Sequence, residues 1–208
     1  MFNLDLIKKP FNRKRKTKNP CLGCGLHLDR CICDAIPKLH LRTKICLVIH
    51  RKELKRTTNT GQLAIKSLVN SEMRVRGDNK IPLDLSDLLT PTYRTFLFFP
   101  SFDAVELTSE LVQSSSVPIQ LIVPDGNWRQ ASKVQSRHPE LKNVQKIKIG
   151  SINPASLHLR TEHKPEGMAT LEAIAQVLGI IEGPEIKKVL MDLYEKKLKN
   201  TLIGRGQK

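Results

Sequence analysis

The chain has 208 residues, of which 39% are hydrophobic, so it can bury the core of one domain with short appendages. This composition excludes a disordered protein, and the lack of an apolar run of about 18 residues argues against a membrane-spanning helix. The formal net charge of +15 indicates a polyanionic partner, and nucleic acid is a better candidate than a merely solvated basic surface.

A basic arm opens the chain. We assign residues 1–19 to it; residues 1–18 hold seven Lys and Arg against one acid, and the rest of the chain still carries a net +9. No apolar stretch follows these charges, so we expect a cytoplasmic protein without a secretory signal. The arm is expected to bind RNA through phosphate contacts that depend on salt and not on sequence. Its cations are Lys8, Lys9, Arg13, Lys14, Arg15, Lys16 and Lys18.

Four cysteines are closely spaced within residues 20–38, in the stretch CLGCGLHLDRCIC. Tetrahedral zinc takes four such soft ligands, and two close pairs on tight turns supply them, with Gly23 and Gly25 in the first turn. The alternatives are disulfides, which a cytoplasmic setting disfavours, and unrelated buried thiols, which the high density disfavours. Four thiolates leave no open coordination position, so we expect a structural zinc, with His27 outside its shell and Cys46 in a core strand. The expected ligands are Cys21, Cys24, Cys31 and Cys33.

Residues 39–208 have the pattern of one α/β domain. Near-continuous apolar strands alternate with helices, which indicates a parallel sheet with helices on both faces. In the last helix Pro184 suits the first helical position, and the apolar stripe is interpreted as core packing. The strands are expected at 44–50, 95–99, 119–123 and 144–149, and the helices at about 61–70, 103–114, 127–137, 170–180 and 184–200.

Polar and special residues gather where the expected strands end. Ligands of a parallel sheet bind beyond the carboxyl ends of its strands, so these loops form the candidate site. Taken singly, each residue has an ordinary alternative, such as a capped turn, a core tryptophan or a surface charge. The candidates are Asn59, Thr60 and Gly61 after the first strand, Pro100 and Ser101 after the second, Asp125, Gly126, Trp128 and Arg129 after the third, and Arg160, Pro165, Gly167, Thr170 and Glu172 around the start of the next helix.

These motifs together resemble the DTW-domain family, the tRNA-uridine aminocarboxypropyltransferases. They are the C-x2-C-x6-C-x-C array, NTG, FP after an apolar strand, DGNWRQA and a late LR…P…TLEA, in family order. In one departure, Asn127 stands where the family's Asp-x-Thr-Trp signature has threonine. Asparagine caps a helix equally well but lacks the hydroxyl. The family looks related to the SPOUT class, so the resemblance implies a SPOUT-like domain with a C-terminal knot.

The resemblance further implies transfer of a 3-amino-3-carboxypropyl group from S-adenosylmethionine to N3 of a tRNA uridine, with release of methylthioadenosine. All strand-end candidates except Trp128 and Arg129 would hold the donor. Asp125 would be the general base for the imide proton, or the group that orients the donor. Trp128 would stack on an extruded uridine, or pack beneath the loop. Arg129 or Arg160 would pair with the donor's carboxylate or with an RNA phosphate.

Two other functions stay open. A SPOUT-type RNA methyltransferase would use the same donor, and the mass of the product separates the two enzymes. A zinc-containing RNA-binding protein without catalysis would rely on the basic arm, and Asp125→Asn would leave it functional. We expect a monomer with tRNA as its partner.

Overall fold

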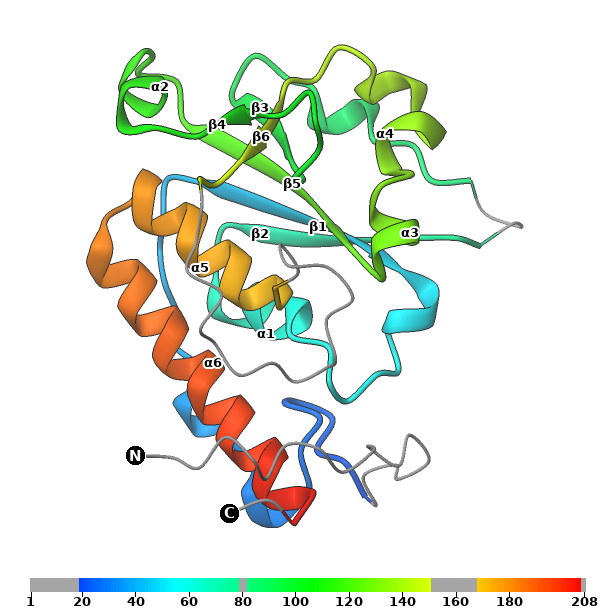
Figure 1. Ribbon diagram of the computed structural model, residues 1–208, viewed down its shortest axis with the longest axis vertical. Coiled ribbons are helices and arrows are strands. Elements are labelled where there is room, and N and C mark those ends of the chain that lie inside the picture. Colours follow the sequence, from blue (N-terminus) through cyan, green and yellow to red (C-terminus); the bar gives the residue numbers. More distant parts are fainter. Residues whose placement is uncertain (1–18, 79–81, 151–167, 207–208) are drawn as a thin grey trace.

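Six strands pair into one sheet in the computed structural model, which describes residues 19–78, 82–150 and 168–206 (Figure 1). All neighbouring strands are parallel, in the order β2-β1-β5-β3-β6-β4. The predicted α/β class with a parallel sheet is therefore confirmed. The strands are β1 (Lys44–His50), β2 (Ser71–Arg76), β3 (Arg94–Phe98), β4 (Val105–Glu106), β5 (Ile119–Asp125) and β6 (Lys146–Lys148).

Two long helices and several short ones accompany the sheet. Pro184 begins the longest of them, as the sequence predicts. In the described residues the α-helices are α1 (Gly61–Ser67), α2 (Ser109–Gln113), α3 (Trp128–Ala131), α4 (Val134–Arg137), α5 (Thr170–Ile181) and α6 (Pro184–Gly204). The 3-10 helices are η2 (Leu28–Arg30), η3 (Cys33–Ala35), η4 (Arg51–Glu53), η5 (Ser86–Leu88) and η6 (Pro139–Leu141).

The sheet is buried on both faces. Because successive strand side chains point to opposite faces, Leu47 and Leu121 pack with α1, α5 and α6, whereas Val48 and Ile122 pack with α4, η5 and η6. Figure 1 shows the first group of helices below the sheet, α4 on the side away from them, and α3 at the end of β5. This two-sided cover explains why the central strands are almost continuously apolar in sequence.

The cysteine segment joins the larger of these two cores. Cys24, Leu26 and Ile32 are buried in the same apolar cluster as α5 and α6. Figure 1 shows the segment beside the C-terminal end of α6, far from the sheet. The boundaries that we place after residues 19 and 38 stay a prediction.

Three expectations about secondary structure are wrong in detail. Strand β2 was not expected, because at the edge of the sheet it alternates charged side chains with Met73 and Val75, which are exposed. The helix expected at 103–114 is the short strand β4 followed by α2. The helix expected at 127–137 is broken into α3 and α4, because Lys133 (φ −90°, ψ 3°) leaves helical geometry.

Some expectations concern residues outside the described part. They include the basic arm and the segment 151–167, so the implied knot also stays a prediction. Within the described ranges, no helix is both long and apolar enough to cross a membrane.

Candidate active site

Asp125, the last residue of β5, is the centre of a buried hydrogen-bonded group. Its side chain lies on the α1/α5 face of the sheet, and the residue is only 6% exposed. Oδ2 accepts a hydrogen bond of 2.6 Å from Asn59 Nδ2, and Oδ1 accepts one of 2.6 Å from Thr170 Oγ1. Both bonds are short, as expected for an ionised acceptor. The carboxylate therefore ties together the turn before α1, the end of β5 and the start of α5.

The turn before α1 is fixed by its own side chains. Asn59 Oδ1 accepts from the backbone N–H of Gln62 at 3.0 Å, while Thr60 Oγ1 accepts from the backbone N–H of Leu171 at 3.2 Å. Asn59, and not Thr60, thus supplies the side-chain cap of α1. Gly61 approaches Asp125 so closely that a Cβ there would lie 2.9 Å from Oδ2. The NTG motif is therefore explained by contact with Asp125 and α5, and not by an ordinary turn alone.

The loop after β5 turns sharply into α3. Asn127 caps this helix: its Oδ1 accepts from Gln130 N–H at 2.9 Å, and Gln130 Oε1 accepts from Asn127 N–H at 2.9 Å. A Cβ on Gly126 would lie 2.8 Å from Gln130 Oε1, so a larger residue there would displace the Gln130 side chain from the cap. The helix-capping role expected for Asn127 is therefore present.

Trp128 begins α3 and packs on Phe99. Their ring centroids are 5.1 Å apart, with an angle of 49° between the ring planes. Trp128 is half-buried, so one part of the indole shapes the loop while another part is accessible. Phe99 directly follows β3, and this contact brings the loops after two neighbouring strands together.

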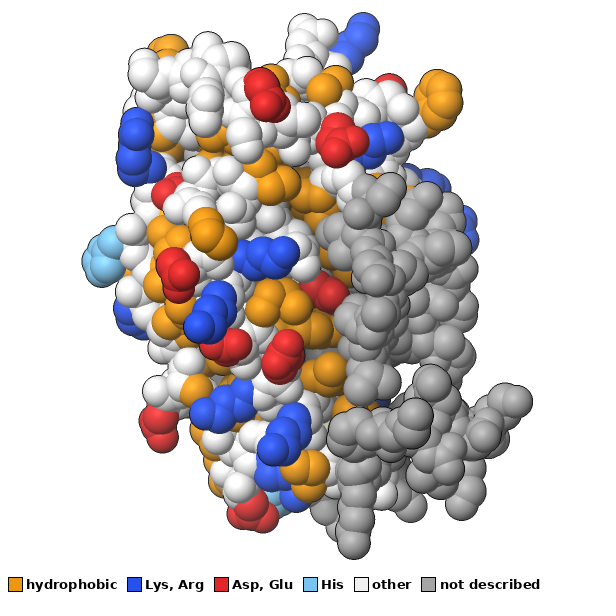
Figure 2. Space-filling view, turned by 60° about the vertical axis from the view of Figure 1, so that its left-hand side comes forward, with side chains coloured by type: hydrophobic (Ala, Val, Ile, Leu, Met, Phe, Trp, Pro, Cys, Tyr) orange, Lys and Arg blue, Asp and Glu red, His pale blue; other side chains and the backbone are white. Residues whose placement is uncertain are grey.

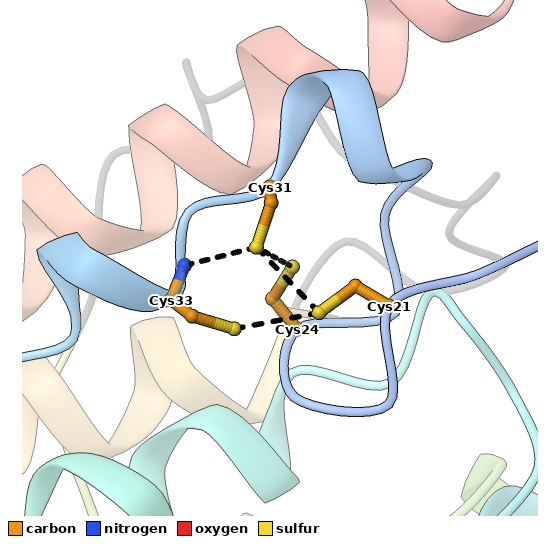
Figure 3. A group of neighbouring side chains, drawn as sticks. All are labelled: Cys21, Cys24, Cys31 and Cys33. Carbon is orange, nitrogen blue, oxygen red and sulfur yellow. Dashed lines mark hydrogen bonds between the residues drawn. The ribbon is translucent and has the colours of Figure 1, made fainter.

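The four cysteines of the N-terminal segment converge on one point (Figure 3). All four Sγ atoms lie within 4.8 Å of one another. The Sγ of Cys21 is 3.5 Å from those of Cys31 and Cys33, and Cys24 Sγ is 3.9 Å from Cys31 Sγ. Tetrahedral Zn²⁺ with bonds of about 2.3 Å holds its sulfur ligands about 3.8 Å apart, so the cluster fits zinc. Nδ1 of His27 pairs instead with the Asp29 carboxylate at 3.0 Å, as expected for a residue outside the shell.

The electrostatics of the cluster also favour a bound cation. The backbone N–H groups of Cys24 and Gly23, followed by the neighbouring thiols, lower the pKa of Cys21 to about 6. Burial and the hydrogen bonds with Cys31 and Cys21 raise the pKa of Cys33 to about 12. Several thiolates side by side repel one another. A bound metal ion would offset this repulsion, because coordinated thiols lose their protons to the solvent and share the charge of the cation. Zinc bound here would hold the segment in shape and would take no part in a chemical step.

Lys197 of α6 connects the cysteine segment to the turn before α1. The residue is fully buried, and Nζ donates to the carbonyl oxygens of Cys24, at 2.5 Å, and Thr57, at 2.9 Å. Gly25, with φ +72°, passes the same backbone so closely that a Cβ would lie 2.9 Å from Thr57 O. A continuous path of contacts thus runs from the cysteines through Thr57 to Asn59 and Asp125.

Comparison with known proteins shows the family to which this chain belongs. The family model described as the DTW domain matches residues 18–202, nearly the whole chain. The chain belongs to the DTW domain family. The match covers both the cysteine segment and the Asp125 group.

Three relatives carry related names. A Drosophila melanogaster protein named tRNA-uridine aminocarboxypropyltransferase 2 is 29% identical over 90% of this chain and 76% of its own length. The Arabidopsis thaliana tRNA-uridine aminocarboxypropyltransferase A is 26% identical over 84% of this chain and 78% of its own. A Macaca fascicularis protein named tRNA-uridine aminocarboxypropyltransferase 2 is 22% identical over 80% of this chain, which spans only 58% of that relative. No solved structure matches the chain significantly.

The remaining candidates of this DTW domain divide into three groups. Glu172 is buried on the first turn of α5, next to Thr170, whereas Arg129 is exposed on α3. Pro100 and Ser101 follow β3, and Ser101 Oγ donates to the exposed Asp103 at 2.8 Å instead of joining the Asp125 group. The other candidates lie outside the described residues: Lys8, Lys9, Arg13, Lys14, Arg15, Lys16, Lys18, Arg160, Pro165 and Gly167.

Three residues near the site escaped the sequence analysis. Lys197 had a signal, because it falls three and four residues after Tyr194 and Leu193 on the apolar stripe of α6, where a charge is unexpected. His50 ends β1 and Arg76 ends β2, at the same edge of the sheet as Asp125. Arg76 had no sequence signal because β2 was not expected, whereas His50 ends a predicted strand but was not singled out as a candidate.

Proposed function

We propose that this DTW domain transfers the 3-amino-3-carboxypropyl group of S-adenosylmethionine to N3 of a uridine in tRNA. The support is membership of the family, the names of three relatives, and the Asp125 group at the carboxyl end of the sheet. The observation that carries the proposal is the convergence of three family motifs, NTG, DGNW and TLEA, on one buried carboxylate.

The reaction requires one proton acceptor. A bond forms between uridine N3 and the terminal carbon of the transferred group, the sulfur–carbon bond breaks, and methylthioadenosine leaves with the bonding electrons. The N3 proton must go to a base, and Asp125 is the carboxylate that we assign to this role. The bonds from Asn59 and Thr170 place one donor on each oxygen of this carboxylate and fix its orientation for that role.

The loops around Asp125 would bind the two substrates. We assign donor contacts to Asn59, Thr60, Gly61, Thr170 and Glu172, which surround the carboxylate on the α1/α5 face or follow it on α5. The accessible part of Trp128 would stack on the extruded uracil, a contact worth about 1–3 kcal/mol. The basic arm, residues 1–19, would add affinity for tRNA, and the chain would act as a monomer.

A double-label experiment tests the proposal. The chain is incubated with unmodified tRNA and with donor labelled separately in the methyl group and in the aminocarboxypropyl group. We expect the aminocarboxypropyl label in the RNA and the methyl label in methylthioadenosine. Methyl label in the RNA would establish a methyltransferase instead, and RNA without either label would favour the non-catalytic RNA-binding protein.

A further inference from the structure

Arg76, the last residue of β2, is a buried cation without an acidic partner in the described part of the chain. It is 5% exposed, and NH1 donates to the backbone carbonyl of Gln130 in α3 at 2.6 Å. A guanidinium has five N–H donors, and the bond to α3 uses one of them. Buried arginines are nearly always paired with acids, because removing a charge from water is costly. An anionic group of a ligand that pairs with the Arg76 guanidinium would therefore be bound favourably.

Further basic side chains surround it. The charge of Arg137, on α4, adds to burial in lowering the pKa of Arg76. His50 lies beside Arg76 in the β1/β2 register; burial, Arg76 and Lys52 lower the pKa of this histidine, against the opposing charge of Glu53. Arg137 and Lys52 are exposed, so the group opens to solvent. Together Arg76, Arg137, His50 and Lys52 form what we call the rim cluster.

The acids near the rim cluster are already engaged. Glu53 pairs with Arg56 at 3.1 Å, and Asp78 lies 3.7 Å from Arg51. Neither is among the groups that perturb Arg76, and in the described residues no carboxylate lies within 4.0 Å of its guanidinium. Among the described residues no acid forms an ion pair with Arg76 or Arg137, so these two arginines place a net positive charge at this edge of the sheet.

The sheet register places the rim cluster relative to Asp125. Ile49 pairs with Asp125 and His50 pairs with Arg76, so both sites lie at the carboxyl ends of adjoining strands. Side chains alternate along a strand, and Asp125 faces α1 and α5 whereas Arg76 faces α3. The rim cluster therefore lies across the strand ends from the carboxylate, on the side where Trp128 begins α3.

We propose that the rim cluster binds a phosphate of the tRNA backbone beside the extruded uridine. The inference rests on the proposed function, because it takes tRNA as the substrate. Arginine suits this ligand, since its planar fork matches phosphate oxygens. The donor, whose contacts we place on the α1/α5 face, and the RNA backbone would then approach the strand ends from opposite faces of the sheet.

The face that carries α5 and α6 supplies a control. Figure 2 brings the side of α5 and α6 forward, and there Lys and Arg side chains are interspersed with Asp and Glu. A phosphate contact is not expected on such a mixed surface. Lys188, exposed on α6, is therefore the matched control cation.

The test compares three variants of the full chain, Arg137→Gln, Arg76→Gln and Lys188→Gln, in tRNA binding over a range of salt concentrations and in donor binding. For Arg137→Gln we expect tRNA affinity to fall roughly tenfold and the slope of log affinity against log salt to flatten by about 0.9, the value for one lost phosphate contact. Lys188→Gln should match the wild type, and donor affinity should be unchanged in all three variants.

Arg137→Gln removes an exposed side chain, so it keeps the test valid even if Arg76→Gln loosens α3. A wild-type salt slope in folded Arg137→Gln and Arg76→Gln would overturn the rim cluster as a phosphate site. Reduced donor affinity with unchanged tRNA affinity would overturn it in favour of the donor's carboxylate. If the flattened slope is found but no nucleoside is modified, the phosphate site stands and the proposed function fails.

Discussion

At the scale of single residues, the site is organised around one carboxylate whose neighbours leave it little freedom. Asn59 and Thr170 each donate to a different oxygen of Asp125, and Gly61 permits the close approach. Such a fixed orientation suits a group that must meet a substrate atom in one geometry. The same bonds explain why Asp125 does not cap α3, a role that Asn127 takes.

Asn127 gives the first prediction. Asn127→Ala removes the side-chain acceptor for Gln130 N–H, so the free energy of unfolding should fall by about 1 kcal/mol. Asn127→Thr restores the family residue and keeps an acceptor, so it should lose much less. Urea unfolding of the two variants and the wild type measures the difference. An alanine variant as stable as the wild type would contradict the capping role.

At the scale of elements, the cysteine segment packs against α6, and a zinc ion bound by its four thiols would hold it further. Removing zinc with a chelator should expose the four ligand thiols to alkylation while Cys46 stays unmodified. Cys46 is fully buried, and burial raises its pKa to about 12, so near pH 8 it is protonated and inaccessible. Mass spectrometry of the alkylated chain counts the modified cysteines. Alkylation of all four ligands without chelation would contradict a zinc site.

Lys197, on α6, gives a second prediction at this scale. Lys197→Met keeps the length of the side chain but leaves the carbonyls of Cys24 and Thr57 without their donor. The free energy of unfolding of the zinc-loaded chain should fall by about 1–3 kcal/mol. Lys199→Met, on the exposed side of α6, is the control and should be nearly neutral. Equal stability of the two variants would show that the buried ammonium stabilises nothing.

At the scale of the whole molecule, two separate basic regions should bind tRNA: the N-terminal arm and the rim cluster. Deleting residues 1–18 removes seven Lys and Arg, so tRNA affinity should fall and its salt dependence should weaken. Filter-binding or calorimetric titration at several salt concentrations measures both. An unchanged salt slope would reject the arm as a phosphate-binding segment.

Much of this molecule could be predicted from local pattern. The apolar runs of β1 and β5 and the closely spaced cysteines have local signatures, and both were identified correctly. Edge strand β2 could not be predicted, because its charged and exposed residues lack the apolar signal of a buried strand. Arg76 was missed for the same reason, and its position beside His50 depends on a pairing between residues 26 apart in sequence. Only tertiary contacts show that Asn59 and Thr170 share one carboxylate.

The central claim is that the Asp125 group catalyses aminocarboxypropyl transfer to tRNA uridine. The most direct test is mass spectrometry of nucleosides from unmodified tRNA after incubation with S-adenosylmethionine and either the wild type or Asp125→Asn. We predict a uridine heavier by one aminocarboxypropyl group with the wild type, and a yield lowered by a factor of about 10²–10⁴ with Asp125→Asn while tRNA affinity is kept. An undiminished yield from the variant, or no heavier uridine from the wild type, would contradict the account.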